Sequence, residues 1–412
     1  HAVGADRALI CVKKYEQLIA ICISTVLVMA GQGIVSPILP LYADSFGVST
    51  SLVGATVTAF GLARLLTNVP AGIVADRSGR RKLLIGGPLV SAVGMFGSGL
   101  ANTIWVLLGF RFVAGLGSAL YMTGATIYLL DIALPEQRGR FIAVNQGALL
   151  VGVGFGPALG GLIADRYDLS MPFYVVAVAG VLTAVYSFFR LPETWTAAET
   201  GAEKETTTAQ TSRWALLRSH DFLLVGLVTV GVFSVRAGVR QTLVPLQLSE
   251  SFGLKVDELG VLFTALGMIG VLLIWPAGAA TDRFGRKMII VPTATLIAVG
   301  IGIVAVADSL PLFIVGLTMS AFGSSITGPA PAAYVADLVS EDQRGAAMGL
   351  YRTFGDIGVV VSPVLSGLLA DAVSISFAIG VNAVFMGIAA AAFMAFAGPS
   401  SPRAENQGLP HD

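Results

Sequence analysis

The sequence has little charge and very few cysteine or histidine residues. Asp, Glu, Lys and Arg make up 12% of its 412 residues, about half of the roughly 25% usual in soluble proteins. The 25 acidic residues balance the 25 basic ones, so the chain lacks the broad basic surface of a nucleic-acid-binding protein. Two cysteines, Cys11 and Cys22, exclude a disulfide scaffold. Three histidines, at the two ends and in the middle linker, exclude a metal centre, and we expect no cofactor.

Long apolar runs are abundant instead. Hydrophobic residues make up 55% of the chain, and its mean hydropathy is +0.81. Because about 17–25 apolar residues span a bilayer as a helix, the sequence predicts an all-α integral membrane protein with twelve transmembrane helices. The predicted spans are 17–41, 51–75, 83–101, 104–128, 141–164, 172–190, 221–246, 257–280, 288–307, 311–335, 346–370 and 373–397.

The basic residues predict the orientation of these spans. One side of the predicted bundle, which carries both chain ends, holds 18 of the 25 Lys and Arg residues. The other side holds two, Arg166 and Lys255, and the remaining five lie inside spans. Since cytoplasmic loops carry an excess of Lys and Arg, both termini are expected in the cytoplasm, in a multi-pass protein of the plasma (inner) membrane.

A polar segment divides the spans into two groups of six. Residues 192–220 are rich in Thr, Ala and Glu and contain no long apolar run, which is typical of a flexible linker. The predicted organisation is therefore an N-terminal six-helix half (1–191), a cytoplasmic linker (192–220), a C-terminal six-helix half (221–398) and a cytoplasmic tail (399–412).

The two halves repeat each other at a constant offset of 206 residues. "GIVADRSGRRK" (72–82) matches "GAATDRFGRK" (278–287), and "YLLDIALPEQRG" (128–139) matches "YVADLVSEDQRG" (334–345). Pro157 falls on Pro363, and Asp165 falls on Asp371. A register held across separated landmarks indicates a duplicated unit. Because each unit has an even number of spans, the two copies are expected to be parallel, around a central cavity.

These motifs resemble those of the major facilitator superfamily of secondary transporters, over about residues 15–397. The 72–82 segment resembles the family's signature between helices 2 and 3, and "RFVAGLGSA" (111–119) resembles its fourth-helix motif. "GVGFGPALGG" (152–161) is similar to the fifth-helix motif of its antiporters, with Ala143 in place of the first glycine. The matching residues are Gly152, Gly156, Pro157, Gly160 and Gly161. The resemblance implies a monomeric drug:proton antiporter and not an enzyme.

The resemblance also implies a cytoplasmic gate. In the family, the turn between helices 2 and 3 and an acid closing helix 4 latch the cytoplasmic side when the cavity faces outward. A purely topological role for these charges is the alternative. The matching positions in the two repeats are Gly72, Asp76, Arg77, Gly79, Arg80, Asp131, Arg138, Asp282, Arg286, Asp337 and Arg344.

Charges inside spans are the sharpest functional signal, because each costs at least about 2.5–3.5 kcal/mol at a helix centre unless it faces protein or water. Asp356 is the only carboxylate near the middle of any span, and Arg352 precedes it by one helical turn. Either the two form a permanent ion pair, or Asp356 takes up a proton and couples proton flow to transport. Arg111 is a candidate for a structural or proton-relay role.

Further polar residues in the spans are candidates for substrate binding. Arg236 and Arg240 are separated by one turn, and with Arg64 they give the expected cavity a net positive charge, which favours anionic or polar-headed substrates. A structural role is the alternative for each candidate. The set is Arg64, Arg236, Arg240, Gln241, Gln32, Tyr121, Asn145, Gln146 and Tyr334.

Two functions therefore compete. The first is proton-coupled export of small amphiphilic or drug-like compounds, and the second is symport or exchange of a defined organic anion bound by the arginines. The sequence has no phosphate-binding G-x-x-x-x-G-K-[ST] loop and no nucleophile motif, so ATP-driven transport and membrane catalysis are not expected. The expected partners are a small-molecule substrate, protons and the lipid bilayer.

Overall fold

The computed structural model describes residues 2–134, 137–194, 217–328, 330–339 and 343–398, apart from some side chains within these ranges. These residues form helices and short connections, with no strand. The N-terminal half contains α1 (Ala2–Val35), α2 (Ile38–Asp44), α3 (Thr50–Ser78), α4 (Arg80–Gly99), α5 (Ile104–Ile132), α6 (Arg138–Arg166) and α7 (Met171–Arg190).

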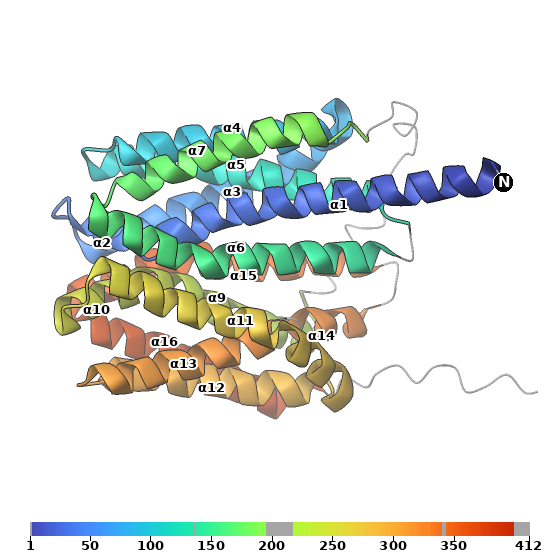
Figure 1. Ribbon diagram of the computed structural model, residues 1–412. Helices are drawn as coiled ribbons and strands as arrows, with labels where there is room; N and C mark the ends of the chain where they lie inside the picture. The colour runs from blue at the N-terminus through green and yellow to red at the C-terminus, as the bar shows by residue number, and fades with distance from the viewer. Residues whose placement is uncertain (1, 135–136, 195–216, 329, 340–342, 399–412) are drawn as a thin grey trace, which may run out of the picture.

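The C-terminal half has the same plan. It contains α9 (His220–Ser234), the π-helix η3 (Val235–Leu243), α10 (Val244–Phe252), α11 (Val256–Phe284), α12 (Arg286–Val306), α13 (Leu310–Thr327), α14 (Ala330–Leu338), α15 (Arg344–Ala372) and α16 (Ile375–Phe396). Figure 1 shows the two halves lying side by side, with α1–α7 in one group and α9–α16 in the other. The tail and most of the linker lie outside the described residues.

The prediction of twelve membrane-spanning helices is confirmed among the described residues. Two spans are less regular than predicted. The first is divided between α1 and α2, next to Pro37. The seventh runs through α9, η3 and α10 without a break. Pro245 explains the irregular turns of η3, since it has no N–H for the carbonyl of Gln241 and its ring clashes with that carbonyl in a regular α-helix.

The duplicated sequence folds into duplicated turns. The described glycines with positive φ form two pairs at the repeat offset, Gly47 with Gly253 and Gly79 with Gly285. Their φ values are 67° and 66° in the first pair and 95° and 84° in the second. Glycine adopts this left-handed region at little cost because it has no Cβ. The duplication is therefore seen in the backbone conformation of the turns as well as in the sequence.

The halves meet along two pairs of helices, α3 with α15 and α6 with α11. We call these contacts the α3–α15 seam and the α6–α11 seam. We call the end of the bundle that carries both described chain ends the terminal end, and the other end the opposite end (Figure 1). The turns at 79 and 285 lie at the terminal end, and those at 45–49 and 253–255 lie at the opposite end.

Candidate functional site: a charged cluster between the two halves

The α3–α15 seam is tightly packed at the opposite end. A Cβ atom on Gly54 would lie 2.2 Å from the carbonyl oxygen of Pro363, and one on Gly367 would lie 2.5 Å from Cα of Ser51. The hydroxyl of Thr58 donates to the carbonyl of Val360 over 2.7 Å. Small residues let helix backbones approach in a membrane where lipid gives no hydrophobic drive for association. The two halves are therefore in backbone contact at this end.

The α6–α11 seam repeats this packing with the matching residues. A Cβ on Gly260, the repeat mate of Gly54, would lie 2.5 Å from the carbonyl oxygen of Pro157. Gly161 faces Gly260 in the same way, at 3.0 Å from its Cα. The hydroxyl of Thr264 accepts a hydrogen bond from the N–H of Ala158 over 2.8 Å. Both seams thus close the opposite end with the same small residues.

The residues of the predicted fifth-helix motif divide between two partners. Gly152, Gly156 and Gly160 face α1, where added Cβ atoms would lie 2.6, 2.6 and 2.1 Å from carbonyl oxygens of that helix. Pro157 and Gly161 face α11 in the other half. One helix therefore joins α1 on one side and the C-terminal half on the other.

The same four helices are open towards the terminal end. Glycines at positions 72, 139, 147, 278 and 349 have no described atom within 4 Å of an added Cβ. These positions lie on α3, α6, α11 and α15, the four helices that form the seams. The packing of the halves against each other is therefore concentrated at the opposite end.

A cluster of charged side chains lies between the open and closed ends. The charge of Arg64 on α3 interacts with those of Asp356 and Arg352 on α15 and of Arg236 on η3. Arg236 and Arg352 are exposed, while Arg64 and Asp356 are half-buried. The predicted residues from distant parts of the sequence are thus brought together across the two halves. We call these four residues and Arg240 the central cluster.

Asp356 interacts with Arg64 as well as with Arg352, so its neighbours come from both halves. Among the described residues, neither arginine approaches it within the 4.0 Å of an ion pair, and no hydrogen bond reaches it. The carboxylate is therefore surrounded by positive charge without being locked to one partner.

Arg236 and Arg240 lie on the π-helical segment η3. Arg240 interacts electrostatically with Arg236, a like charge, and within the described part of the chain neither has a carboxylate within ion-pair distance. Arg240 and the adjacent Gln241 are half-buried. π-Helical turns are rare and frequently occur at functional sites. The sequence predicted the two cations but not the widened turn that carries them.

Arg111 lies inside the N-terminal half and not in the central cluster. It is 6% exposed, and its guanidinium stacks 4.7 Å from the centroid of the Phe60 ring on α3. Its Nη1 lies 4.0 Å from the sulfur of Met95, and its buried Nε has no partner among the described residues. Cation–π contact compensates part of the desolvation of such a group. Phe60 adjoins Gly61, which faces Val359 in the α3–α15 seam.

Two of the predicted substrate contacts, Tyr121 and Asn145, belong to an enclosed network. Thr25 donates to the side-chain oxygen of Asn145 over 2.8 Å and lies 3.0 Å from the hydroxyl of Tyr121. Tyr121 is fully buried and Asn145 is 5% exposed. The network joins α1, α5 and α6, so the present geometry shows interhelical hydrogen bonds.

The other predicted contacts differ in their access. Tyr334 is 1% exposed, and its hydroxyl donates to the carbonyl of Gly398 at the terminal end. Gln32 is half-buried and Gln146 is exposed. Of the polar candidates outside the central cluster, Gln32, Gln146 and Gln241 are therefore at least partly exposed in this conformation.

The predicted gate residues form an ion pair within the N-terminal half. Nε of Arg80 lies 2.9 Å from a carboxylate oxygen of Asp131, and Nη2 lies 3.9 Å from Asp76. Nη1 donates to the carbonyl of Ala75 over 3.2 Å. Asp76 remains largely exposed. The pair fastens the turn at Gly79 to α5 and does not cross to the other half.

Glu193 is a member of this turn that the sequence analysis assigned to the linker. Its carboxylate accepts from the N–H groups of Arg80 and Arg81 over 2.9 and 3.2 Å. An acid at a helix N-terminus accepts hydrogen bonds from the free N–H groups, and its negative charge interacts favourably with the helix dipole. A Cβ on Gly79 would lie 2.4 Å from this carboxylate. The only signal in the sequence is that this acid stands just beyond the end of span 6. Only the fold shows which helix it caps.

The C-terminal half repeats the gate turn. Nε of Arg286 donates to Asp337 over 3.1 Å, and its Nη1 donates to the carbonyl of Thr281 over 3.0 Å. These partners are the repeat mates of Asp131 and Ala75. Arg77 and Arg138 are exposed, and Arg344 begins α15. The side chain of Asp282 lies outside the described residues.

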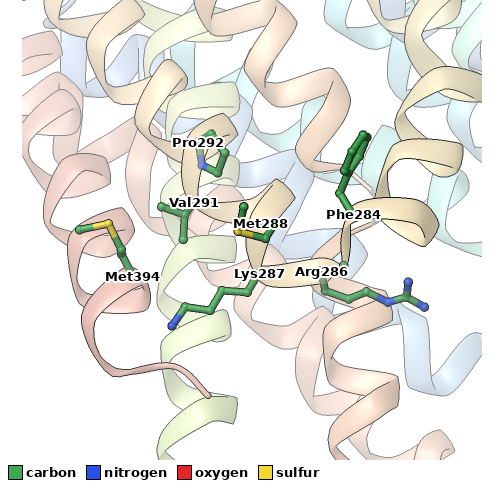
Figure 2. Close-up of a pocket in the computed structure, with 8 residues that line it drawn as sticks. Phe284, Arg286, Lys287, Met288, Val291, Pro292 and Met394 are labelled. Carbon is green, nitrogen blue, oxygen red and sulfur yellow. The ribbon is translucent and has the colours of Figure 1, made fainter. Parts of the chain in front are cut away.

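A surface pocket of about 480 Å³ adjoins the second gate turn (Figure 2). Its lining is apolar except for Arg286 and Lys287, which point to opposite sides in Figure 2. Lys287 donates to the carbonyl of Ala397 at the end of α16. The pocket lies on α11, α12 and α16 of one half, so it is separate from the central cluster.

A family model described as the Major Facilitator Superfamily matches the chain twice, over residues 21–239 and 238–411. The first match runs through the N-terminal half and into η3, and the second begins in η3 and covers the rest of the chain to residue 411. Together they cover almost the whole sequence.

Curated relatives and solved structures agree with this match. Multidrug resistance protein 2 of Bacillus subtilis is 24% identical over 87% of the chain and 90% of its own length. Quinolone resistance protein NorA of Staphylococcus aureus is 23% identical over 89% and 94%. The fold resembles a bacterial homologue of the human lysosomal transporter Spinster in an inward-facing, unoccupied conformation, with a TM-score of 0.80, 16% identity and coverage of 93% and 96%.

Proposed function

Because the chain belongs to the major facilitator superfamily, a family of transporters, we propose that it is a proton-coupled antiporter that exports small amphiphilic or drug-like compounds. Its relatives named for multidrug and quinolone resistance support export of such compounds. The excess of Lys and Arg at the terminal end supports a cytoplasmic location for that end. We further propose that the protein acts as a monomer in the plasma membrane.

The observation that carries the proposal is the position of Asp356. It is the only carboxylate near the middle of a span, and it interacts with cations of both halves without a close ion pair. In the proposed cycle, a proton on Asp356 removes the negative charge that Arg64 and Arg352 share. The charge balance between the halves then depends on protonation, which couples proton movement to their rearrangement.

The conformation supports alternating access. Among the described residues, the halves touch at the opposite end and not through the glycines at the terminal end, which supports entry to the central cluster from the proposed cytoplasm. A substrate entering from that side would meet Arg64, Arg236, Arg240 and Gln241, with Gln32 and Gln146 as further polar contacts. The gate residues of the two turns, Arg80 with Asp131 and Arg286 with Asp337, would stay paired while the halves move.

The test is transport into proteoliposomes under an imposed pH gradient. The parent protein should move a lipophilic cation against the proton. Asp356→Asn should abolish gradient-driven transport and retain exchange that needs no proton, since the amide keeps the shape but cannot titrate. Asp165→Asn removes an exposed acid far from the cluster and serves as the matched control. Undiminished coupling in Asp356→Asn would remove this residue from the mechanism.

A second candidate function is supported by Arg236 and Arg240. Their lack of an acidic partner among the described residues favours an organic anion as substrate. A lipophilic anion of matched size, tested in the same liposomes, separates the two candidates. If the anion is the substrate, Arg236→Ala and Arg240→Ala should raise the apparent Kd of the anion more than that of a neutral ligand. Equal weakening of a neutral ligand would indicate a structural role.

A further inference from the structure

The two seams differ at the opposite end in the contact that an acid makes there. Asp371, at the end of α15, directs its carboxylate across the boundary between the halves. One oxygen accepts from the N–H of Thr50 over 2.7 Å, and the other accepts from the N–H of Ser51 over 3.0 Å. These two residues begin α3. An acid of the C-terminal half therefore caps a helix of the N-terminal half.

Helix α3 has no cap from its own sequence. The hydroxyl of Ser49, at the N-cap position, makes no capping hydrogen bond and lies 2.9 Å from the hydroxyl of Ser51. The first N–H groups of a helix need an acceptor, and a negative charge there is favoured by the helix dipole. For α3 the side-chain acceptor comes from Asp371, and separating the halves at this seam removes it.

The matching place in the other seam lacks this contact. Asp165 is the repeat mate of Asp371, and Asp257 is the repeat mate of Ser51. Asp165 is exposed and forms no hydrogen bond with α11 in the described part of the chain. Asp257 places a second carboxylate at the start of α11, and its buried Oδ1 has no hydrogen-bond partner among the residues that the structure describes. Two acids cannot share this position without like-charge repulsion.

Helix α11 is instead capped from within its own half. The carboxylate of Glu258 accepts from the N–H of Lys255 over 2.9 Å. The start of α11 therefore keeps its cap whether or not the α6–α11 seam is closed. The start of α3 keeps its cap only while the α3–α15 seam is closed.

We propose that Asp371 is a latch that holds the opposite end closed and biases the protein towards the conformation open at the terminal end. The latch acts on one seam only. Gly367 allows this contact, because its lack of a Cβ lets α15 lie against Ser51. The mechanism requires no substrate and no proton, so it stands apart from the role proposed for Asp356.

The test is a spin-label distance measurement without substrate. Labels at Asn102→Cys and Asp308→Cys, exposed positions at the opposite end of different halves, report opening there, in a chain with Cys11→Ser and Cys22→Ala. Asp371→Asn should raise the ratio of open to closed conformers about tenfold, since a hydrogen bond to a charged group is worth about that factor. Asp371→Glu keeps the negative charge, so it should raise the ratio of open to closed conformers less than Asp371→Asn does. Asp165→Asn is the matched control and should leave the distances unchanged.

A gain-of-function variant completes the test. Asp257→Ser gives α11 the residue that α3 has, so Asp165 should form a second latch and reduce the open population. Distances in Asp371→Asn equal to those of the parent would overturn the proposal. If that variant does not fold, unchanged distances in Asp257→Ser overturn it instead. Neither result bears on transport driven by Asp356, because no pH gradient is applied.

Discussion

The two ends of the boundary between the halves are built from similar residues but are packed differently. At the opposite end, glycines of α3, α6, α11 and α15 contact backbone atoms of the other half. Towards the terminal end, glycines of the same helices have no atom of the described structure within 4 Å of an added Cβ. The difference shows that, in the described structure, the packing between the halves is concentrated at the opposite end.

The most direct way to break this difference is to add volume at the closed end. Gly54→Val should have the largest effect, because a Cβ there would lie 2.2 Å from the carbonyl oxygen of Pro363. Overpacking costs about 1–3 kcal/mol, and separating the seam is the route by which the chain can relieve it. We expect a lower Tm and more open conformers at the opposite end, measured with the label pair at 102 and 308.

Gly72→Val is the matched comparison on the same helix. Nothing lies within 4 Å of its added Cβ, so Tm in the absence of substrate should stay near that of the parent. Closing the terminal end would bring this position towards the other half, so transport should fall although the fold is intact. An equal drop in Tm for both variants would contradict the contrast between the ends.

The ion pairs of the gate turns sharpen the comparison, because they act within each half. Arg80→Ala removes the partner of Asp131, with 2.9 Å between the charged atoms. The substitution also removes the hydrogen bond from Nη1 to the carbonyl of Ala75. The loss should be about 2 kcal/mol, as for a hydrogen bond made by a charged group, and should appear as a lower Tm. Distances at the opposite end should not change, because no atom of this pair crosses the boundary.

Arg286→Ala provides the comparison in the other repeat. Its pair with Asp337 is longer, at 3.1 Å, and its side chain is more exposed, at 17% against 9% for Arg80. Water weakens such a pair, so the loss in Tm should be smaller. A larger loss for Arg286→Ala would show that burial does not rank these two turns.

Sequence reasoning reached the architecture because hydropathy and basic residues act over whole helices. The twelve spans and the duplication follow patterns visible in the chain. The gate motifs were also visible in both repeats, but the structure was needed to show that Arg80 pairs with Asp131 and Arg286 with Asp337. The assembly of Arg64, Arg236 and Asp356 was also accessible, because a charge in a span must face protein or water.

The sequence could not predict the contacts that depend on which helices pack against each other. Tyr121 and Asn145 are polar residues in spans like Gln146, but only the structure shows that Thr25 joins them inside one half. Glu193 and Asp371 cap helices more than 100 residues away. Nothing local distinguishes them from ordinary acids at helix ends, since the helix that each one caps is chosen by packing.

The smallest change in stability is expected when an acid at the opposite end is substituted whose hydrogen bonds all lie within one half. Asp168 accepts from the N–H groups of Ser170 and Met171 over 2.7 and 3.0 Å, at the start of α7. The hydroxyl of Ser170, aided by these N–H groups, holds the pKa of the Asp168 carboxyl below its usual range, against a smaller effect of burial. The cap is therefore present above the pKa of the unfolded chain, about 3.9, and is lost as the pH falls through the lower folded value.

Asp168→Asn should cost about 0.5 kcal/mol near pH 7, at the low end for a helix cap because the site is exposed. The difference in Tm from the parent should shrink as the pH falls below about 4, since the parent then loses the same charge. The label distances at 102 and 308 should not move, in contrast to those of Asp371→Asn. A shift as large as that of Asp371→Asn would mean that any acid at this end holds the seam, and that crossing between the halves is not what makes Asp371 a latch.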